Sequence, residues 1–197
     1  ALNRLLEHTA EEVALEDYVA ELQSHIQTLI NDHRLLSAEQ KRMLMENTRT
    51  LAEHARRLSP AVDGKVMTAL THGDFQPGNI LVDGEQVWLI DWEYSGRRQA
   101  GYDGLVFVLG ARFPRDLAAR VQTFVTQDTA NNILIKLGIC PDILQQTANE
   151  RRVHMAMLLL EELVCRLEEI ADQPFMQLDG SLTVLESEII RWIKPTK

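Results

Sequence analysis

The chain of 197 residues is poor in glycine, and no glycine precedes Gly64. A glycine-rich loop that cradles phosphates through its backbone N–H groups is therefore excluded from the segment before that residue. Cysteine is also rare: Cys140 and Cys165 each lie among apolar neighbours in a helix-like segment. We expect two reduced, buried thiols and no disulfide framework.

Basic residues are in deficit, which gives the chain a net charge of −9. A nucleic-acid partner is not expected, because binding to phosphates needs clustered Lys and Arg. Long apolar runs are missing as well, since the longest, residues 155–160, is far shorter than a membrane span. The first residues show no signal-peptide pattern. We expect no membrane partner, and a cytoplasmic location.

The remaining composition, 45% hydrophobic and 25% charged, is that of one ordinary globular domain. Apolar residues recur at three- and four-residue steps over most of the chain, which predicts helices. The expected helices cover residues 11–33, 38–58, 104–112, 114–127, 131–137, 141–170 (as one helix or two) and 182–192. Ser37 and Gln40 form a capping-box signature at the start of the second helix.

One segment departs from this helical pattern. Residues 80–82 and 87–90 are short, mostly β-favouring runs, and Asp83-Gly84 between them is a strong turn signal, so a tight hairpin is predicted. Asn79 enters the first strand and Asp91 leaves the second, so both lie at the open end of the hairpin. Their side-chain oxygens are placed to reach one ion.

Asp74 is tied to Asn79 by a short connection that contains Pro77 and Gly78, which favours a sharp reversal. A carboxylate next to an amide–carboxylate pair suits Mg²⁺, a hard cation that favours oxygen ligands and shares them with phosphates. Each residue alone is equally typical of a turn or a cap. Their joint spacing around a hairpin favours phosphoryl-transfer chemistry.

These segments resemble a known family. The His-Gly-Asp start and the asparagine of residues 72–79, with Ile-Asp-Trp-Glu at 90–93, are similar to the catalytic and metal-binding segments of protein-kinase-like phosphotransferases. The nearest branch is that of the aminoglycoside phosphotransferases and choline kinases. The resemblance implies an ATP-dependent phosphotransferase that acts on the hydroxyl group of a small molecule.

The resemblance also implies roles for single residues. Asp74 would orient the acceptor hydroxyl and take its proton, while Asn79 and Asp91 would hold Mg²⁺ against the phosphates of ATP. His72 would support the loop, and Asp103 would start a helix and brace the loop.

Glu93 is left open between a contact at the metal and a salt bridge to a loop arginine. The acceptor is also left open, with a cationic molecule or a sugar as the classes that fit.

Kinases of this type carry an upstream lobe with a glycine-rich loop and a strand lysine. Because no glycine precedes Gly64, we expect this chain to be the C-terminal lobe alone, with the N-terminal nucleotide lobe absent. The expected fold is mainly α with a small β-hairpin. We divide it into a helical pair (1–60), the catalytic loop and metal hairpin (61–102) and a helical acceptor-binding region (103–197). The isolated chain is expected to be inactive.

Other interpretations stay open. A kinase-like fold kept as a non-catalytic binding or scaffolding module is the main alternative. A metal-dependent phosphoesterase is disfavoured, because no histidines follow Asn79 to bind a second metal. The acidic pairs at 161–162 and 168–169 are interpreted as the solvated face of a helix, the arginines at 97–98 as solvated loop residues, and Trp88 and Trp92 as packing residues.

Overall fold

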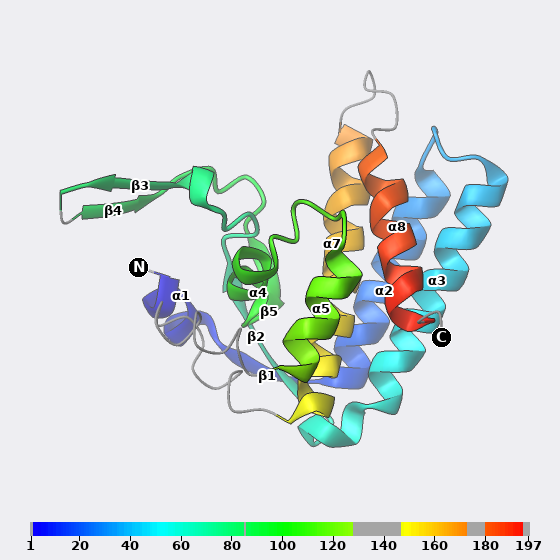
Figure 1. Ribbon diagram of the computed structural model, residues 1–197, viewed down its shortest axis with the longest axis horizontal. Coiled ribbons are helices and arrows are strands. Elements are labelled where there is room, and N and C mark those ends of the chain that lie inside the picture. The colour runs from blue at the N-terminus through cyan, green and yellow to red at the C-terminus, as the bar shows by residue number, and fades with distance from the viewer. Residues whose placement is uncertain (1, 85, 128–146, 173–179, 195–197) are drawn as a thin grey trace.

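The computed structural model describes residues 2–84, 86–127, 147–172 and 180–194. Its helices and strands are arranged as a helical bundle with two small sheets beside it (Figure 1). In chain order they are α1 Leu2–Thr9, β1 Glu11–Ala14, α2 Leu15–Asp32, α3 Ala38–Arg57, η1 Ser59–Val62, β2 Lys65–Thr71, η2 Pro77–Asn79, β3 Ile80–Asp83, β4 Gln86–Leu89, β5 Gly96–Gln99, α4 Tyr102–Leu109, α5 Leu117–Thr126, α7 Ala148–Asp172 and α8 Gly180–Ile193.

The bundle holds most of the hydrophobic core. Helices α2, α3, α7 and α8 lie side by side, and α5 packs against α7 and α8. The apolar face of α2 includes Leu15, Ile26 and Ile30, which are fully buried. The predicted capping box of α3 is confirmed, because Ser37 and Gln40 each accept a hydrogen bond from the other's backbone N–H. This helix ends before Pro60, as expected.

A three-stranded antiparallel sheet lies beside the bundle, in the order β1-β2-β5. The sequence interpretation missed both outer strands. Residues 11–14 were expected to begin a helix, but they pair with β2, with Val13 opposite Val66. Residues 96–99 were expected in a polar loop, but they pair with the other edge of β2. Neither strand has an apolar alternation, so their strand conformation comes from pairing with the half-buried β2.

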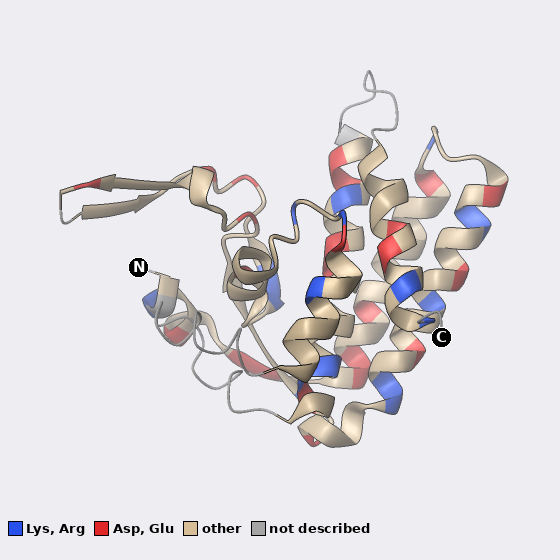
Figure 2. Ribbon diagram, in the orientation of Figure 1, with Lys and Arg blue, Asp and Glu red and all other residues tan. Residues whose placement is uncertain are grey.

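The predicted hairpin is confirmed as the β3–β4 ribbon, with Leu81 opposite Trp88 and Val82 opposite Val87. The ribbon projects from the body of the molecule (Figure 1) and is almost wholly tan in Figure 2, where charged residues are coloured. Its four central side chains are all at least half exposed. Trp88 is therefore not a packing residue in this structure, contrary to the expectation.

The last two helices agree with the pattern of the sequence, but the first acidic pair of α7 does not. Glu161 and Glu162 were expected on a solvated face, and both are buried in the structure. The periodicity of α7 is misleading here because the two carboxylates find polar partners on other elements. The predicted helix at 131–137, the beginning of the helix expected from 141, and Cys140 lie outside the described residues. None of the described helices is both long and apolar enough to span a bilayer.

Candidate active site

Strand β2 ends at Thr71, and residues 72–76 then form a loop, called here the 72–76 loop. Gly73 has a φ of +87°, and a Cβ placed there would lie 2.0 Å from the carbonyl oxygen of Tyr94. Only glycine lets the loop come this close to the segment that follows the ribbon. The loop is thereby pressed against that segment.

Asp103, in the first turn of α4, binds the backbone of the loop. Its two carboxylate oxygens accept hydrogen bonds from the backbone N–H groups of His72, at 2.7 Å, and Gly73, at 2.9 Å. Burial raises the pKa of Asp103, and the two N–H donors oppose that rise. We expected Asp103 to cap α4, but Gly101 is the N-cap residue. The Asp103 carboxylate is used entirely for the loop.

His72 joins the loop to the end of the ribbon. Its Nε2 lies 2.8 Å from the carbonyl oxygen of Ile90, and its Nδ1 lies 3.3 Å from the backbone nitrogen of Asp74. A backbone N–H can only donate, so this network assigns the proton to Nε2. The ring also packs on Trp92, with 4.5 Å between the centroids. Both ring nitrogens are therefore engaged by backbone groups.

The structure brings Asp74 and Asn79 together. Nδ2 of Asn79 donates to the carbonyl oxygen of Asp74, at 2.9 Å, and to its Oδ2, at 2.8 Å. Gln76 donates to the same Oδ2 at 2.8 Å. The amide nitrogen of Asn79 is thus committed to Asp74. Its Oδ1 has no hydrogen-bond partner among the described residues, so a hard oxygen donor is left over.

A backbone hydrogen bond closes the open end of the ribbon, from the N–H of Ile90 to the carbonyl oxygen of Asn79 at 3.1 Å. Asp91 is the next residue after Ile90. It has a φ of +67° and is exposed. Within the described ranges its carboxylate has no hydrogen-bond or ion-pair partner. The same residues contain no group of three or more His, Cys, Asp or Glu side chains arranged to hold a metal. The amide oxygen of Asn79 and the carboxylate of Asp91 are nevertheless the ligand types that Mg²⁺ prefers.

Arg112 is a residue of this site that the sequence interpretation missed. Its Nε donates to Oδ1 of Asp74 at 2.8 Å, and its Nη2 donates to the carbonyl oxygen of Gly73. The side chain is only 8% exposed. We expected Arg112 to end a helix, but α4 ends at Leu109 and Gly110 turns the chain back with a φ of +56°. That glycine was the available signal, although no spacing links Arg112 to Asp74.

The two loop arginines behave differently from each other. Arg97 is half exposed and lies 3.5 Å from Glu11, so the expectation of a solvated residue suits it. Arg98 is partly buried and donates to Thr71 Oγ1 at 3.0 Å and to the carbonyl oxygen of Tyr94 at 2.9 Å. Its solvated interpretation was wrong. Neither arginine forms an ion pair with Glu93.

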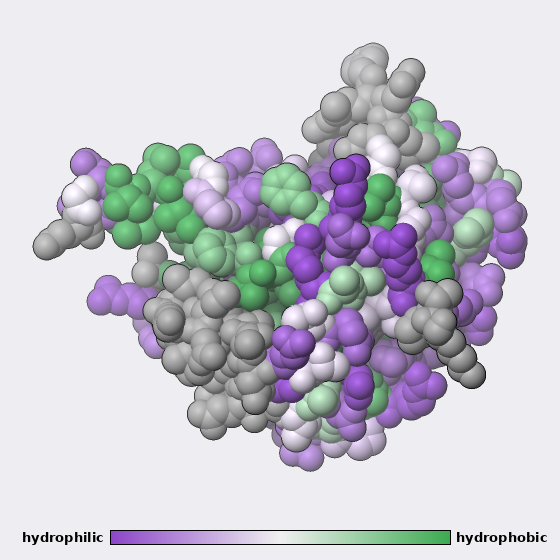
Figure 3. All heavy atoms as spheres, in the orientation of Figure 1, coloured by the Kyte–Doolittle hydropathy of each residue, from purple (hydrophilic) through white to green (hydrophobic). Residues whose placement is uncertain are grey.

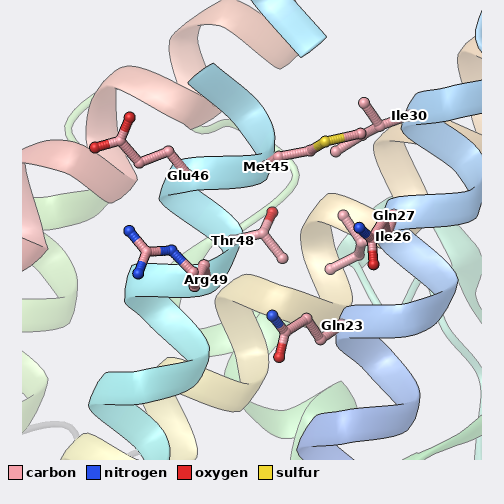
Figure 4. Close-up of a pocket in the computed structure, with 8 residues that line it drawn as sticks. All are labelled: Gln23, Ile26, Gln27, Ile30, Met45, Glu46, Thr48 and Arg49. Atoms are coloured by element: carbon pink, nitrogen blue, oxygen red, sulfur yellow. The ribbon is translucent and has the colours of Figure 1, made fainter. Parts of the chain in front are cut away.

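A pocket of about 470 Å³ lies beside this region. Its lining includes three carboxylates, Glu93, Glu168 and Glu169, together with Tyr94. The ring of Tyr94 also lies 5.5 Å from the guanidinium of Arg112, so the pocket adjoins the Arg112–Asp74 pair. A smaller pocket, of about 200 Å³, lies between α2 and α3 and is lined by no residue of the 72–76 loop (Figure 4).

Glu161 joins α7 to α2 and to β5. It accepts hydrogen bonds from the hydroxyl of Tyr18 and, at 2.7 and 2.8 Å, from the backbone and side-chain nitrogens of Gln99. The Oε1 of Gln99 lies 2.9 Å from Nδ1 of His154. Burial raises the pKa of Glu161 to about 7 and lowers that of His154 to about 4. The network keeps β5 in place beside the loop.

Glu162 has different partners, which lie on the side of the active site. Its Oε1 accepts a hydrogen bond from the hydroxyl of Tyr102 at 2.5 Å. Burial, and then the charge of Glu162, raise the pKa of Tyr102, so its hydroxyl stays protonated. Cys165, one turn further along α7, is a buried free thiol, as the sequence indicated. The Sγ atom lies 3.7 Å from both Arg98 and Arg112.

A comparison with known protein families places these residues in context. Residues 6–130 match the model of the phosphotransferase enzyme family, which is more than half of the chain. The chain belongs to this family. No curated protein and no solved structure gave a match in the corresponding comparisons. The matched segment includes Asp74, Asn79, Asp91, Asp103 and Arg112, whereas Glu161 and Glu162 lie beyond it.

Proposed function

We propose that this chain is the catalytic lobe of a phosphotransferase that moves the γ-phosphoryl group of ATP to the hydroxyl of a small molecule. In this reaction the acceptor oxygen forms a bond to phosphorus, and the bond from phosphorus to the leaving oxygen of ADP breaks. The hydroxyl proton goes to the carboxylate of Asp74. Catalysis of this type depends mainly on positioning and on charge stabilisation.

The arrangement of Asp74 and Asn79 supports the proposal most strongly. One side-chain amide fixes the carboxylate that would receive the proton, and the same amide presents its oxygen elsewhere. Proton acceptor and metal donor are therefore oriented by one hydrogen bond. Nothing about a turn or a helix cap requires such an arrangement.

The donor set fits Mg²⁺, because an amide oxygen and an unpaired carboxylate suit a small hard cation. Asn79 and Asp91 are the residues that would hold it. The bound ion would neutralise the charge that develops on the phosphates of ATP during transfer.

A nucleotide-binding lobe is the second part of the proposal. The β3–β4 ribbon exposes Leu81, Val82, Val87 and Trp88 by 50%, 69%, 58% and 56%. Figure 3 shows this as a green surface on the projecting arm. Apolar patches of this kind mark surfaces that become covered. We propose that the lobe that binds adenine and the phosphates packs here, so the lobe described here does not transfer phosphate by itself.

The pocket next to Arg112 is the proposed acceptor site. Three carboxylates and Arg98 line it. Glu168 and Glu169 already have basic partners, whereas Glu93 has no ion-pair partner among the described residues. These charges suit a cationic acceptor or a sugar whose hydroxyls donate hydrogen bonds. This gives Glu93 a place in acceptor binding, as an alternative to the metal contact considered from the sequence.

A non-catalytic binding module remains the second candidate, because one observation favours it. Both oxygens of the Asp74 carboxylate already have partners, Oδ1 with Arg112 and Oδ2 with Asn79 and Gln76. An oxygen that already accepts a hydrogen bond from Arg112 has fewer lone pairs left for the hydroxyl of an acceptor. The two candidates differ in whether Asp74 is needed for turnover.

The deciding experiment measures formation of ADP by the full-length protein with Mg²⁺, ATP and a panel of acceptors: aminoglycosides, choline-like amines, homoserine and sugars. We expect one acceptor to stimulate ADP formation, and Asp74→Asn to lower that rate by at least about 100-fold. Asp32→Asn, the same change at the exposed end of α2, is the matched control and should keep the full rate. A rate that survives Asp74→Asn would refute the catalytic assignment.

A further inference from the structure

Two buried polar atoms lack hydrogen-bond partners, and one of them belongs to the arginine that is bonded to Asp74. Nη1 of Arg112 and Oε2 of Glu162 are both buried without a partner. They lie 3.7 Å apart, just beyond hydrogen-bonding distance. The two atoms form an ion pair at this separation, but neither makes a hydrogen bond, which is unusual for buried polar atoms because their desolvation is then not fully compensated.

The other contacts of Arg112 show why its guanidinium does not close this gap. Nε and Nη2 are drawn to Oδ1 of Asp74 and to the carbonyl oxygen of Gly73. Glu162 is held from its other side by Tyr102, with the carboxylate fully buried. Arg112 is thus hydrogen-bonded to the carboxylate of Asp74 and lies close to that of Glu162 without a hydrogen bond to it.

Glu162 is the better second partner of the two glutamates near Arg112. Glu169 lies 3.9 Å from the same Nη1, but it is already bonded to Arg166 at 2.6 Å and is 20% exposed. A shift of the Arg112 side chain by about 1 Å would bring Nη1 into hydrogen-bonding distance of Glu162. The same shift would satisfy both of the unpartnered atoms.

We propose that Arg112 is a positioning residue with two alternative partners, Asp74 and Glu162. Bonded to Asp74, it holds the carboxylate in place while no acceptor is bound. Bonded to Glu162, it leaves Oδ1 free to accept the proton of the acceptor hydroxyl. This inference rests on the proposed function in assigning that proton to Asp74, but the exchange of partners is a property of the chain alone. The exchange also explains why Oδ1 of Asp74 accepts a hydrogen bond from Arg112 in this structure, although Asp74 is the proposed proton acceptor.

The first test is a crystal structure of the full-length protein with Asp74→Asn, which keeps the shape of the side chain and removes its charge. We expect the distance from Nη1 of Arg112 to Oε2 of Glu162 to fall from 3.7 Å to about 2.9 Å. In solution, the side-chain Nε–Hε signal of Arg112 should shift between the wild type and this variant. An Arg112 that stays on residue 74, with the distance and the signal unchanged, would overturn the proposal.

The second test is a double-mutant cycle on the melting temperature, which does not depend on crystals. Glu162→Gln should lower Tm more in the Asp74→Asn background than in the wild type, because Glu162 is then the main partner of Arg112. Any effect on the bond from Tyr102 is the same in both backgrounds and cancels. Glu168→Gln, on the same helix but paired with His25, should lower Tm equally in both.

Equal losses for Glu162→Gln in the two backgrounds would show that Arg112 does not exchange partners. Neither test uses nucleotide or acceptor, so its failure is separate from that of the proposed function. If the protein is active but Arg112 does not exchange partners, the phosphotransferase assignment still holds. If Arg112 exchanges partners but the protein is inactive, the exchange belongs to a non-catalytic binding module.

Discussion

In the 72–76 loop, buried polar groups have several partners each, whereas in the adjoining β3–β4 ribbon large apolar side chains have almost none. The loop is held by Asp103, Arg112 and the ring of His72. The ribbon exposes Val82 by 69% and Trp88 by 56%. The chain itself therefore fixes the proposed proton acceptor, while the side that carries Asn79 and Asp91 adjoins a surface suited to a covering element.

The largest expected effect concerns the bonds that hold the loop. Asp103→Ala leaves the N–H groups of His72 and Gly73 buried without an acceptor, which should cost about 4 kcal/mol of unfolding free energy. Asp103→Asn keeps one acceptor oxygen and should cost less. Urea unfolding of both variants checks this. A loss below about 1 kcal/mol in Asp103→Ala would show that the loop does not depend on this carboxylate.

The next effect is a pair of opposite pH dependences in the network behind the loop. In the folded protein Glu161 has a pKa of about 7, above its ordinary value of 4.5. Its contribution to the unfolding free energy is therefore complete below pH 4.5 and is lost as the pH rises to 7. His154 has a pKa of about 4 in the folded protein, below its ordinary value of 6.5. Its contribution to the unfolding free energy is therefore complete above pH 6.5 and is lost as the pH falls to 4. In the wild type the two trends oppose each other.

Single variants should unmask each trend, with an amplitude of about 3 kcal/mol. In Glu161→Gln, unfolding free energy should rise from pH 4 to pH 6.5, because the contribution of His154 is no longer opposed by that of Glu161. In His154→Gln it should fall from pH 4.5 to pH 7. Urea unfolding at a series of pH values measures both, and parallel profiles in the two variants would contradict the assignment.

The smallest effect is expected in the ribbon. Trp88→Ser removes a side chain that is mostly in water, so unfolding free energy should change by less than about 0.5 kcal/mol. Self-association of the chain, measured by sedimentation velocity, should decrease because the exposed apolar surface becomes smaller. A loss comparable to that of Asp103→Ala would mean that the ribbon is part of the core, and the contrast with the loop would disappear.

The hairpin, the capped α3 and most helical segments could be predicted because their signals are local. The turn at Asp83-Gly84 and the capping box at Ser37 act within a few residues. The strands β1 and β5 could not, because they depend on pairing with β2. Taken alone, the sequence of β1 favours the start of a helix and the sequence of β5 favours a polar loop.

The candidate site divides in the same way. Asp74, Asn79 and Asp91 could be predicted because two neighbouring motifs, at residues 72–79 and 90–93, carry all three, and their catalytic and metal roles stay predictions. Arg112 and Glu162 could not be found, since they reach the site from 38 and 88 residues beyond Asp74, counted along the chain. The burial of Glu162 depends on Tyr102, which no pattern within α7 reveals.

The most direct test separates chemistry from metal binding in the full-length protein. Isothermal titration calorimetry with Mg²⁺ and ATP should show that Asp91→Asn weakens binding at least about tenfold, while Asp74→Asn changes it less than about threefold. The same Asp74 variant should have lost acceptor-dependent ADP formation. Normal binding by Asp91→Asn, or weakened binding caused by Asp74→Asn alone, would contradict the roles assigned to these two carboxylates.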